Sequence, residues 1–278
     1  MQSVQDSVSL SFSYSVKELV EMLTVVGDAV SSTSTLPVLQ NVLVGVSEGM
    51  LSIISTDLNI WISTSSRVVS STPGKIVADY ARLRGFVSGF EDGNIELSIS
   101  GGKVIARRGK SRLLMNTVSP DSFPVKPEVT WESEFRIECD ELLRMVRATK
   151  RSTVNEKYKP VLNGILWKSS PGVVEMVATD GLRLSRARTQ RTDQNDGQSV
   201  VIPKYAIDIV ETNLTKIGAG DVSVLLSKDA FMLRAGSLEI MSRVIAGAYP
   251  DYNRVIPTGG TCSIVVDCSS LLSAVKRA

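Results

Sequence analysis

The carboxylates best placed for acid–base chemistry occur in two matching pairs, Thr56-Asp57 and Thr179-Asp180. Two carboxylates can act as general acid and general base when they converge on one substrate. Each pair ends a copy of the same apolar segment, so the two aspartates are expected at equivalent positions of separate domains. An aspartate beside a threonine at a strand end commonly caps a turn through its side chain. We therefore predict a structural role, with a β-rich hydrolase that uses Asp57 or Asp180 as an alternative.

Other patterns typical of catalysis or ligand binding are absent from the sequence. Histidine does not occur, which removes the usual Ser-His-Asp triad and the commonest metal ligand. Neither GxxxxGK[ST] nor a strand-linked GxGxxG is present. The cysteines Cys139, Cys262 and Cys268 form no CxxC pair, which favours a reducing, cytoplasmic setting. We expect no enzymatic activity, no cofactor, no metal, and no membrane span or signal peptide.

Basic residues suggest a different kind of site, although the net charge is only +2. The cations that could contact nucleic acid are Arg82, Arg84, Arg144, Arg147, Lys150, Arg151 and Lys204, with Arg107, Arg108, Lys110 and Arg112 on a predicted hairpin. A charged helix face is most often plain solvated surface. If the helices faced one concave surface, their cations would follow a phosphate backbone without reading bases.

The elements that would carry these residues are arranged as a repeat. The segment PVLQNVLVGVSEGMLSIISTD, from Pro37 to Asp57, recurs without a gap as PVLNGILWKSSPGVVEMVATD, from Pro160 to Asp180. Eight of the 21 aligned positions are identical, several times more than chance residue usage would give. Repetition on this scale predicts an architecture assembled from copies.

The repeat extends upstream and downstream of this segment. Val16, Leu19, Val20 and Leu23 form a helical apolar stripe, which Cys139, Leu142, Leu143 and Val146 reproduce. Second helices are predicted at Asp79–Phe90 and Lys204–Leu214, and hairpin turns at Glu48-Gly49 and Gly101-Gly102. Strands are predicted near Ile95–Ser100, Lys103–Arg108 and Arg112–Val118, and an inserted loop at Arg188–Gln198. Each copy is thus an α+β domain with two helices and about eight strands.

A third copy is predicted at the end of the chain. The strand Cys262–Val266 and the stripe Cys268, Leu271, Leu272 and Val275 repeat the start of the other copies. A matching third unit would need roughly 100 further residues. We expect the last 17 or so residues to be poorly ordered or loosely docked, because a lone strand and helix cannot bury their apolar faces. The proposed domains are residues 1–125, 126–258 and 259–278, with the first boundary in the proline-containing stretch Ser119–Ser133.

Several segments together resemble one known family. STLPVLQNVL with STDLNI, YKPVLNGILW with VATDGLRL, and AYPDYNRVIP are similar, in this order, to the bacterial DNA polymerase III beta subunit, the sliding clamp. The resemblance implies the DNA clamp fold, in which repeated domains each pack two helices on antiparallel sheets. It also implies a homodimeric ring of three-domain subunits around duplex DNA, which tethers the polymerase to its template.

The resemblance also implies particular site residues. Tyr158 would stack or contact DNA beside the basic residues named above. The family's partner-peptide pocket carries over onto Leu162, Thr179, Gly181, Arg183 and Leu184, together with Pro250, Arg254 and Val255. The apolar members would take aliphatic or aromatic anchors of a peptide, and the arginines would border the groove.

Our hypothesis is a non-catalytic sliding clamp that lacks most of its third domain. Its expected partners are duplex DNA, the catalytic subunit of DNA polymerase III, the clamp loader and other proteins with a clamp-binding motif. A full-length form is expected to be a ring-shaped homodimer, and the present chain mainly a monomer. A two-domain clamp that closes as a trimer, as in archaea and eukaryotes, is the alternative within the same class.

Overall fold

A computed structural model describes residues 10–31, 33–69, 71–155, 158–190, 197–218, 220–257, 259 and 262–278. The chain forms two compact units, Met1–Gly247 and Ala248–Ala278.

The first unit contains both complete copies of the repeat. The first copy comprises β1 (Ser11–Ser15), α1 (Val16–Val26), β2 (Asn41–Ser47), β3 (Met50–Thr56), β4 (Ile60–Arg67), β5 (Ser71–Thr72), β6 (Gly74–Asp79), α2 (Tyr80–Val87), β7 (Asn94–Ser100), β8 (Lys103–Arg108) and β9 (Ser111–Asn116). The second comprises β10 (Ser133–Glu138), α3 (Cys139–Thr149), β11 (Gly164–Ser170), β12 (Val173–Thr179), β13 (Leu184–Gln190), β14 (Ser199–Pro203), α4 (Lys204–Ile217), β15 (Asp221–Leu226), β16 (Ala230–Ala235) and β17 (Leu238–Arg243). Apart from the short β5, the order of helices and strands is the same in both, so the predicted repeat and α+β fold are confirmed.

Short 3-10 helices connect these elements. They are η1 (Gly27–Ala29), η2 (Pro37–Gln40), η3 (Pro120–Ser122), η4 (Lys150–Ser152) and η5 (Pro160–Asn163). Both predicted two-residue hairpin turns are present. Glu48 and Gly49 have φ of 51° and 72°, and Gly101 and Gly102 have φ of 56° and 70°. These left-handed values are those of the turn that matches the twist of a two-residue hairpin.

The strands form three antiparallel sheets, with orders β5-β1-β7-β8-β9, β13-β12-β11-β14 and β10-β15-β16-β17-β4-β3-β2-β6. The eight-stranded sheet combines four strands of each copy. Its central junction is the pairing of β17 with β4, in which Ile240 lies opposite Ile62. In the described residues, β9 and β13 each have a neighbouring strand on one side only.

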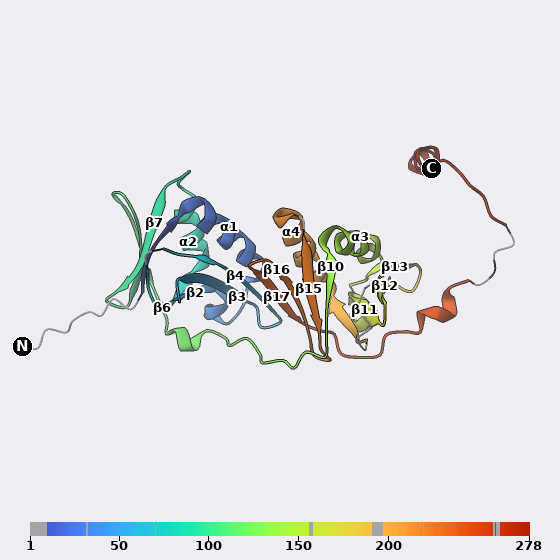
Figure 1. The fold of residues 1–278 in the computed structure, drawn as a ribbon, viewed down its shortest axis with the longest axis horizontal. Helices are drawn as coiled ribbons and strands as arrows, with labels where there is room; N and C mark the ends of the chain where they lie inside the picture. Colours follow the sequence, from blue (N-terminus) through green and yellow to red (C-terminus); the bar gives the residue numbers. More distant parts are fainter. Residues whose placement is uncertain are drawn as a thin grey trace, which may run out of the picture. The chain divides into compact units, whose positions relative to one another are not determined.

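The four helices of this unit lie on the same side of the strands (Figure 1). α1 packs on β3 and β4, and α3 packs on β12 and β13. The predicted apolar stripes make these contacts: Leu19 and Leu23 of α1 and Leu142 and Val146 of α3 are all buried. One continuous hydrophobic core therefore runs beneath the helices of both copies.

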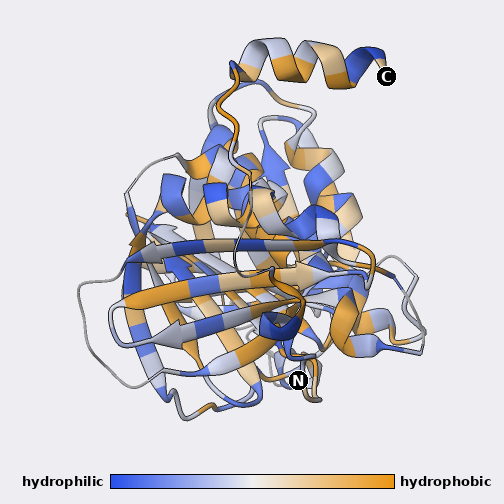
Figure 2. Cartoon of the chain, turned by 90° about the vertical axis from the view of Figure 1, so that its right-hand side faces the viewer, coloured by the Kyte–Doolittle hydropathy of each residue, from blue (hydrophilic) through white to orange (hydrophobic). Residues whose placement is uncertain are grey.

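The second unit contains η6 (Tyr252–Val255) and α5 (Cys268–Arg277). The predicted third-copy helix is confirmed, and Figure 2 shows apolar and polar residues intermixed along α5, the helix that ends at the C-terminus. Its Leu271, Leu272 and Val275 are all exposed. The predicted strand Cys262–Val266 is wrong, because these residues have irregular backbone. The described part of this unit contains no strand that could pair with the segment, and an unpaired strand is not stable.

The predicted loop Arg188–Gln198 is partly wrong. Arg188, Thr189 and Gln190 continue β13 and pair with β12, opposite Glu175 and the residues before it. Most residues of β13 are polar, so the sequence lacks the alternation of apolar and polar residues that usually indicates a strand. Residues 191–196 lie outside the described residues.

Across the described residues, no helix combines the length and apolar character needed to cross a membrane.

We predict that the β4–β17 junction contributes strongly to stability. Ile240 is fully buried in the common core. Ile240→Ala should lower the free energy of unfolding by about 2–5 kcal/mol, because it removes buried methyl groups and leaves a cavity. The matched control Leu114→Ala, at a side chain that is 40% exposed, should change it by only about 0.5 kcal/mol. Urea denaturation followed by circular dichroism measures both; equal effects would contradict a central role for this junction.

Candidate nucleic-acid and partner-binding sites

Asp57 closes the turn between β3 and β4. Its Oδ1 accepts hydrogen bonds from the backbone N–H groups of Asn59 and Ile60, each at 2.8 Å. The hydroxyl oxygen of Thr56 accepts another from the N–H of Leu58 at 2.9 Å. The Thr-Asp pair thus satisfies three backbone donors of a tight turn.

Asp180 has the same role between β12 and β13. Its Oδ1 accepts from the N–H groups of Leu182 at 3.0 Å and Arg183 at 2.9 Å. The backbone hydrogen bonds from Arg183 and Leu182 lower the pKa of Asp180 below its usual value. Gly181 has φ of 90°, a conformation that favours glycine. The prediction that both aspartates cap turns is confirmed, which leaves a hydrolase based on Asp57 or Asp180 without structural support.

Arg147 of α3, Lys150 of η4 and Lys204 of α4 are joined to acidic residues in one row. Arg147 Nε lies 2.9 Å from Glu211 Oε1, and Glu211 also pairs with Lys150. Lys150 Nζ lies 3.3 Å from Asp208 Oδ1, whose other oxygen lies 2.5 Å from Lys204 Nζ. We call these five residues the α3–α4 ion-pair chain. Its three cations and two carboxylates leave a net charge of about +1 rather than the +3 suggested by the cations alone.

The pKa shifts of Lys150 and Glu211 in this chain both favour the charged forms. The hydrogen bond to Glu211 is the main cause that raises the pKa of Lys150. Burial acts to raise the pKa of Glu211, but hydrogen bonds from Lys150 and Arg147 outweigh it and the pKa is lowered. The contact between Lys150 and Glu211 therefore stabilises the charge on both side chains.

Asp208 and Glu211 were missed by the sequence analysis, which considered only the cations. A usable signal was present in the helical spacing. Lys204 and Asp208 are four residues apart, and Glu211 follows three residues later, so all three share one face of α4. Their pairing with α3, in contrast, could not be read from local spacing.

Arg144 is held against the protein. Its guanidinium makes two hydrogen bonds to Glu141, at 2.8 and 2.7 Å, and a third to the carbonyl oxygen of Arg188 at 3.0 Å. The hydrogen bond from Arg144 lowers the pKa of Glu141 to about 2, against the opposing effect of burial. This residue joins α3 to β13, so it contributes to structure as well as to surface charge.

The remaining DNA-binding candidates differ in how freely they reach solvent. Arg82 donates to the carbonyl oxygen of Leu114 at 2.9 Å, and the Arg84 guanidinium carbon lies 6.0 Å from the centre of the Tyr80 ring. Arg151 is exposed, and Tyr158 is 94% exposed. Both lie close to the α3–α4 ion-pair chain in sequence.

The predicted basic hairpin is confirmed as β8 and β9, but its cations do not act alike. Arg107 and Arg112 are exposed and lie opposite each other in the sheet. Arg108 Nη2 instead pairs with Asp92 at 3.1 Å, and its guanidinium carbon lies 4.7 Å from the centre of the Phe90 ring. Stacking and pairing of this kind fix Arg108 as a structural contact.

A hollow of about 610 Å³ lies at the N-terminal end of α4. Its lining includes Asn59 from the β3–β4 turn, Asn155, Lys204, Asp208 and Arg243 at the end of β17. The hollow thus brings the amide of Asn59 from the first copy beside amides, two cations and one carboxylate of the second. Such groups can bind phosphate oxygens in any base sequence.

The structure places the predicted partner-peptide residues in two groups. Thr179 and Leu184 are paired across β12 and β13, and the Thr179 hydroxyl donates to the carbonyl oxygen of Arg183 at 2.8 Å. The turn therefore brings Thr179, Gly181, Arg183 and Leu184 together, and Leu162 is buried in η5. Arg183 Nε pairs with Asp180 at 2.9 Å.

The other three predicted pocket residues, Pro250, Arg254 and Val255, belong to the second unit. Arg254 Nε lies 3.1 Å from Asp251 Oδ2, and Val255 is 69% exposed. Whether all eight residues form one pocket remains a prediction. In the described residues, no group of three or more acidic or cysteine side chains could hold a metal ion.

Comparison with known proteins agrees with this geometry. Residues 10–127 match the family model of the DNA polymerase III beta subunit N-terminal domain, and residues 136–251 match that of its central domain. The beta sliding clamp of Pseudomonas aeruginosa is 29% identical over 273 residues, which cover 96% of this chain and 74% of the relative. That of Escherichia coli K12 is 26% identical over 271 residues, covering 97% and 74%.

Solved structures give the same result. A Pseudomonas aeruginosa sliding clamp crystallised with griselimycin superposes with a TM-score of 0.91 at 28% identity, covering 97% of this chain and 73% of that one. A Bacillus subtilis clamp at 24% identity, with a TM-score of 0.91, supports the fold alone.

The chain has two successive repeats, each with helices packed on strands and with cations on the helical side. The two repeats match the N-terminal and central domain models in the same order, and this combination defines a DNA clamp. The chain belongs to the family of the bacterial DNA polymerase III beta subunit, the beta sliding clamps. The chain spans about three quarters of the length of the relatives it matches. Both matched models describe the bacterial subunit, so the two-domain trimeric clamp has no support from them.

We predict a specific effect of acid at the Glu141–Arg144 pair. The pKa of Glu141 is lower in the folded state than its ordinary value of 4.5. The stability that ionised Glu141 contributes to the fold is therefore present above pH 4.5 and is lost as the pH falls towards about 2. Wild-type protein should lose about 1 kcal/mol more stability than Glu141→Gln over this range, a value reduced for solvent screening. Asp140→Asn, in the same helical turn, is the control and should retain the wild-type acid dependence. Urea denaturation at several pH values checks the difference; parallel curves for wild type and Glu141→Gln would contradict it.

Proposed function

We propose that this protein acts as a mobile tether that surrounds duplex DNA and keeps a replicative polymerase on its template. The observation that carries the proposal is the placement of α1 to α4 on one side of the sheets of two consecutive clamp repeats. A tether of this kind works through geometry and high effective concentration, so it needs no catalytic turnover of its own. A role in bacterial replication would place the protein in the cytoplasm.

The proposed DNA contacts are weak and independent of base sequence. The α3–α4 ion-pair chain, Arg82, Arg84, Arg144, Arg151 and Tyr158 are candidates for contacts to phosphate and sugar. Cations that already have carboxylate partners attract phosphates less strongly than free cations do. Such a surface suits a protein that must move along DNA rather than remain at one position.

We further propose three clamp domains at residues 1–125, 126–258 and 259–278, the last range being the start of the third domain. In a form that carries the whole third domain, two subunits would close head to tail into a ring. The proposed protein partners are the polymerase III catalytic subunit, the clamp loader and other proteins with a clamp-binding motif.

The proposed docking site for these partners in the first unit is the β12–β13 turn with Leu162, and Pro250, Arg254 and Val255 are proposed peptide-binding residues of the second unit. Leu162 and Leu184 would take the apolar anchors of an extended peptide, and Arg183 would lie at the rim. The turn geometry fixed by Asp180 supports this assignment, because it holds Arg183 and Leu184 in a defined orientation.

We predict that retention of the protein on DNA depends on whether the DNA has free ends. A form extended by the third domain, loaded by its clamp loader and ATP, should stay on nicked circular plasmid through gel filtration at high salt. Cutting the plasmid once should release it, because a ring can slide off an end. Light scattering on the unloaded sample establishes its oligomeric state. Release by salt from circular and linear DNA alike would indicate ordinary electrostatic binding instead.

We also predict that the substitution Glu211→Gln strengthens binding to duplex DNA. The substitution frees Arg147 and Lys150 from a shared carboxylate. At low salt the association constant should rise several-fold, and the slope of log K against log salt should steepen by up to about 1 per phosphate engaged. Fluorescence anisotropy with a labelled duplex measures both quantities.

Glu134→Gln is the matched control for this experiment. It changes the net charge equally, but Glu134 is exposed on the face of β10 opposite the core. An equal gain from both variants would show that total charge, rather than the helical side, governs DNA binding.

A further inference from the structure

Charged side chains gather on the outer face of the four-stranded sheet, the face turned away from α3. Trp167, Met176 and Ala187 of this sheet are buried in the core that the sheet shares with α3. Side chains alternate between the two faces of a strand, so the neighbours of these three residues point outwards. The charged ones are Lys168 of β11, Glu175 of β12, and Arg186 and Arg188 of β13. We call these four residues the outer charge cluster.

The strand register puts three of them in one row. Lys168 lies directly opposite Glu175, and Glu175 lies directly opposite Arg188. The two cations therefore start from strands that are two spacings, or about 10 Å, apart, with the carboxylate between them. Arg186 lies beside this row, two residues from Arg188 along β13.

Glu175 holds both arginines while it is itself buried. Its side chain is only 5% exposed. Its Oε2 accepts a hydrogen bond from Arg186 Nε at 2.7 Å, lies 2.6 Å from Arg186 Nη2, and also accepts from Arg188 Nε. A buried carboxylate needs such partners, because an uncompensated buried charge is costly. One carboxylate is shared among three cations, so the cluster keeps a net charge of about +2.

Two of the cations retain donors for a ligand. Arg188 uses Nε for Glu175, yet its side chain is 57% exposed, and within the described ranges its Nη groups have no hydrogen-bond partner. Lys168 is also exposed and forms no ion pair with any described residue. A guanidinium held at one nitrogen still presents N–H groups in the plane that suits a carboxylate.

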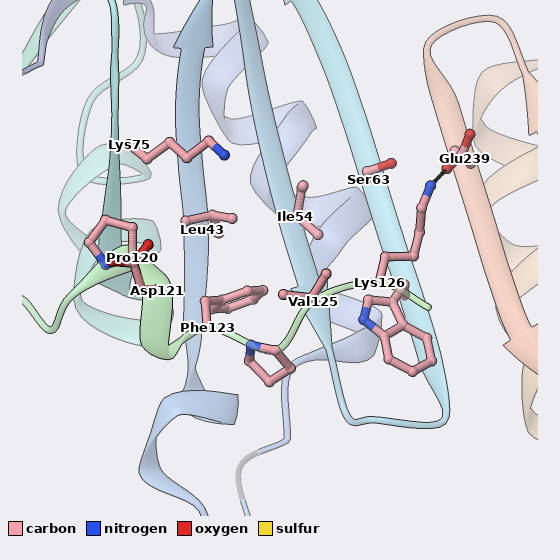
Figure 3. Close-up of a pocket in the computed structure, with 12 residues that line it drawn as sticks. Leu43, Ile54, Ser63, Lys75, Pro120, Asp121, Phe123, Val125, Lys126 and Glu239 are labelled. Carbon is pink, nitrogen blue, oxygen red and sulfur yellow. Dashed lines mark hydrogen bonds and ion pairs between the residues drawn. The ribbon is translucent and has the colours of Figure 1, made fainter. Parts of the chain in front are cut away.

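The first copy shows that the fold does not require these charges. The residues 123 positions earlier, in the same strand pairing, are small and uncharged: Gly45, Ser52, Ser63 and Ser65. Figure 3 shows this face of the first copy, where Ser63 of β4 stands at the position equivalent to Arg186. The same three strands thus form without a charge at any of the four positions. The cluster is a property of the second copy alone and not of the repeated architecture.

The position of the cluster separates it from the proposed DNA contacts. It lies on the opposite side of the sheet from α3, whereas the α3–α4 ion-pair chain lies on the helical side. Duplex DNA held against the helices therefore does not reach it. The net positive charge and the free Nη groups of Arg188 match a carboxylate-bearing protein segment instead.

We propose that the outer charge cluster binds an acidic segment of a partner protein, with carboxylates on Lys168 and on the Nη groups of Arg188. An extended segment rises about 3.3 Å per residue, so acidic residues three apart match the separation of about 10 Å between the two cations. Glu175 keeps the guanidinium of Arg188 oriented for this contact. The site uses none of the residues proposed for DNA or for the clamp-binding peptide, and the inference does not rest on those proposals.

The test uses two short serine-glycine peptides that carry glutamate or glutamine at every third position. In the intact chain at low salt, the glutamate peptide should shift the backbone amide resonances of Lys168, Glu175 and Arg188 together, to saturation in the millimolar range, because exposed ion pairs are individually weak. The glutamine peptide should leave these resonances unchanged. The double substitution Lys168→Gln with Arg188→Gln should weaken binding of the glutamate peptide about five-fold, and Lys168→Gln alone about two-fold.

Arg136→Gln is the matched control, because it removes one positive charge from an exposed position of β10 outside the cluster. It should retain the wild-type affinity for the glutamate peptide. Lys168→Gln, at an exposed side chain, keeps the test valid even if Arg188→Gln folds poorly. The proposal is overturned if the glutamate peptide gives no saturable shift at the cluster, or if Arg136→Gln weakens binding as much as Lys168→Gln does. An equal loss of affinity for a labelled DNA duplex in the double variant would also overturn it, because the cluster would then be a nucleic-acid contact.

Discussion

The pairing of β4 with β17 is the constraint on which the rest of the molecule depends. It joins strands from two copies into one sheet, so that neither copy has to shield that edge from water. The shared sheet gives the helices of both copies a common side and lets their apolar stripes bury into one core. It also creates the opposite face, where residues 117–132, which join the copies, lie over strands of both. The helical side and this covered face are thus two results of the same junction.

The electrostatics of the helical side differ from what its cations suggest. Glu211 and Asp208 divide three cations between them, and Glu141 holds Arg144. A protein that bound DNA tightly at one position would gain from unpaired cations. Compensated charge gives a shallower attraction that varies little along a duplex, which agrees with a mobile tether.

Local sequence patterns predicted the repeated parts of the fold and left the joints between them undetermined. The apolar stripe that begins at Val16 predicted α1, and its copy at Cys139 predicted α3, because helical periodicity is a local property. The turn role of Asp57 was likewise predictable from its neighbours. The β4–β17 junction and the contacts of Glu211 with α3 join residues far apart in sequence, which no local pattern specifies. The strand expected at Cys262–Val266 failed for the same reason, since a strand depends on a partner as well as on its own composition.

Two of the sheet edges that are unpaired in the described residues, β9 and β13, have a consequence for assembly. Position for position, β9 of the first copy corresponds to β17 of the second, and β13 of the second corresponds to β4 of the first. These two edges are therefore of the same two kinds that already join the copies. Contacts between unlike edges are heterologous, so each addition leaves another pair open. Copies that join through these edges can therefore keep adding. The assembly closes into a ring when the rotation between neighbouring copies divides a full turn, and it grows into a filament otherwise.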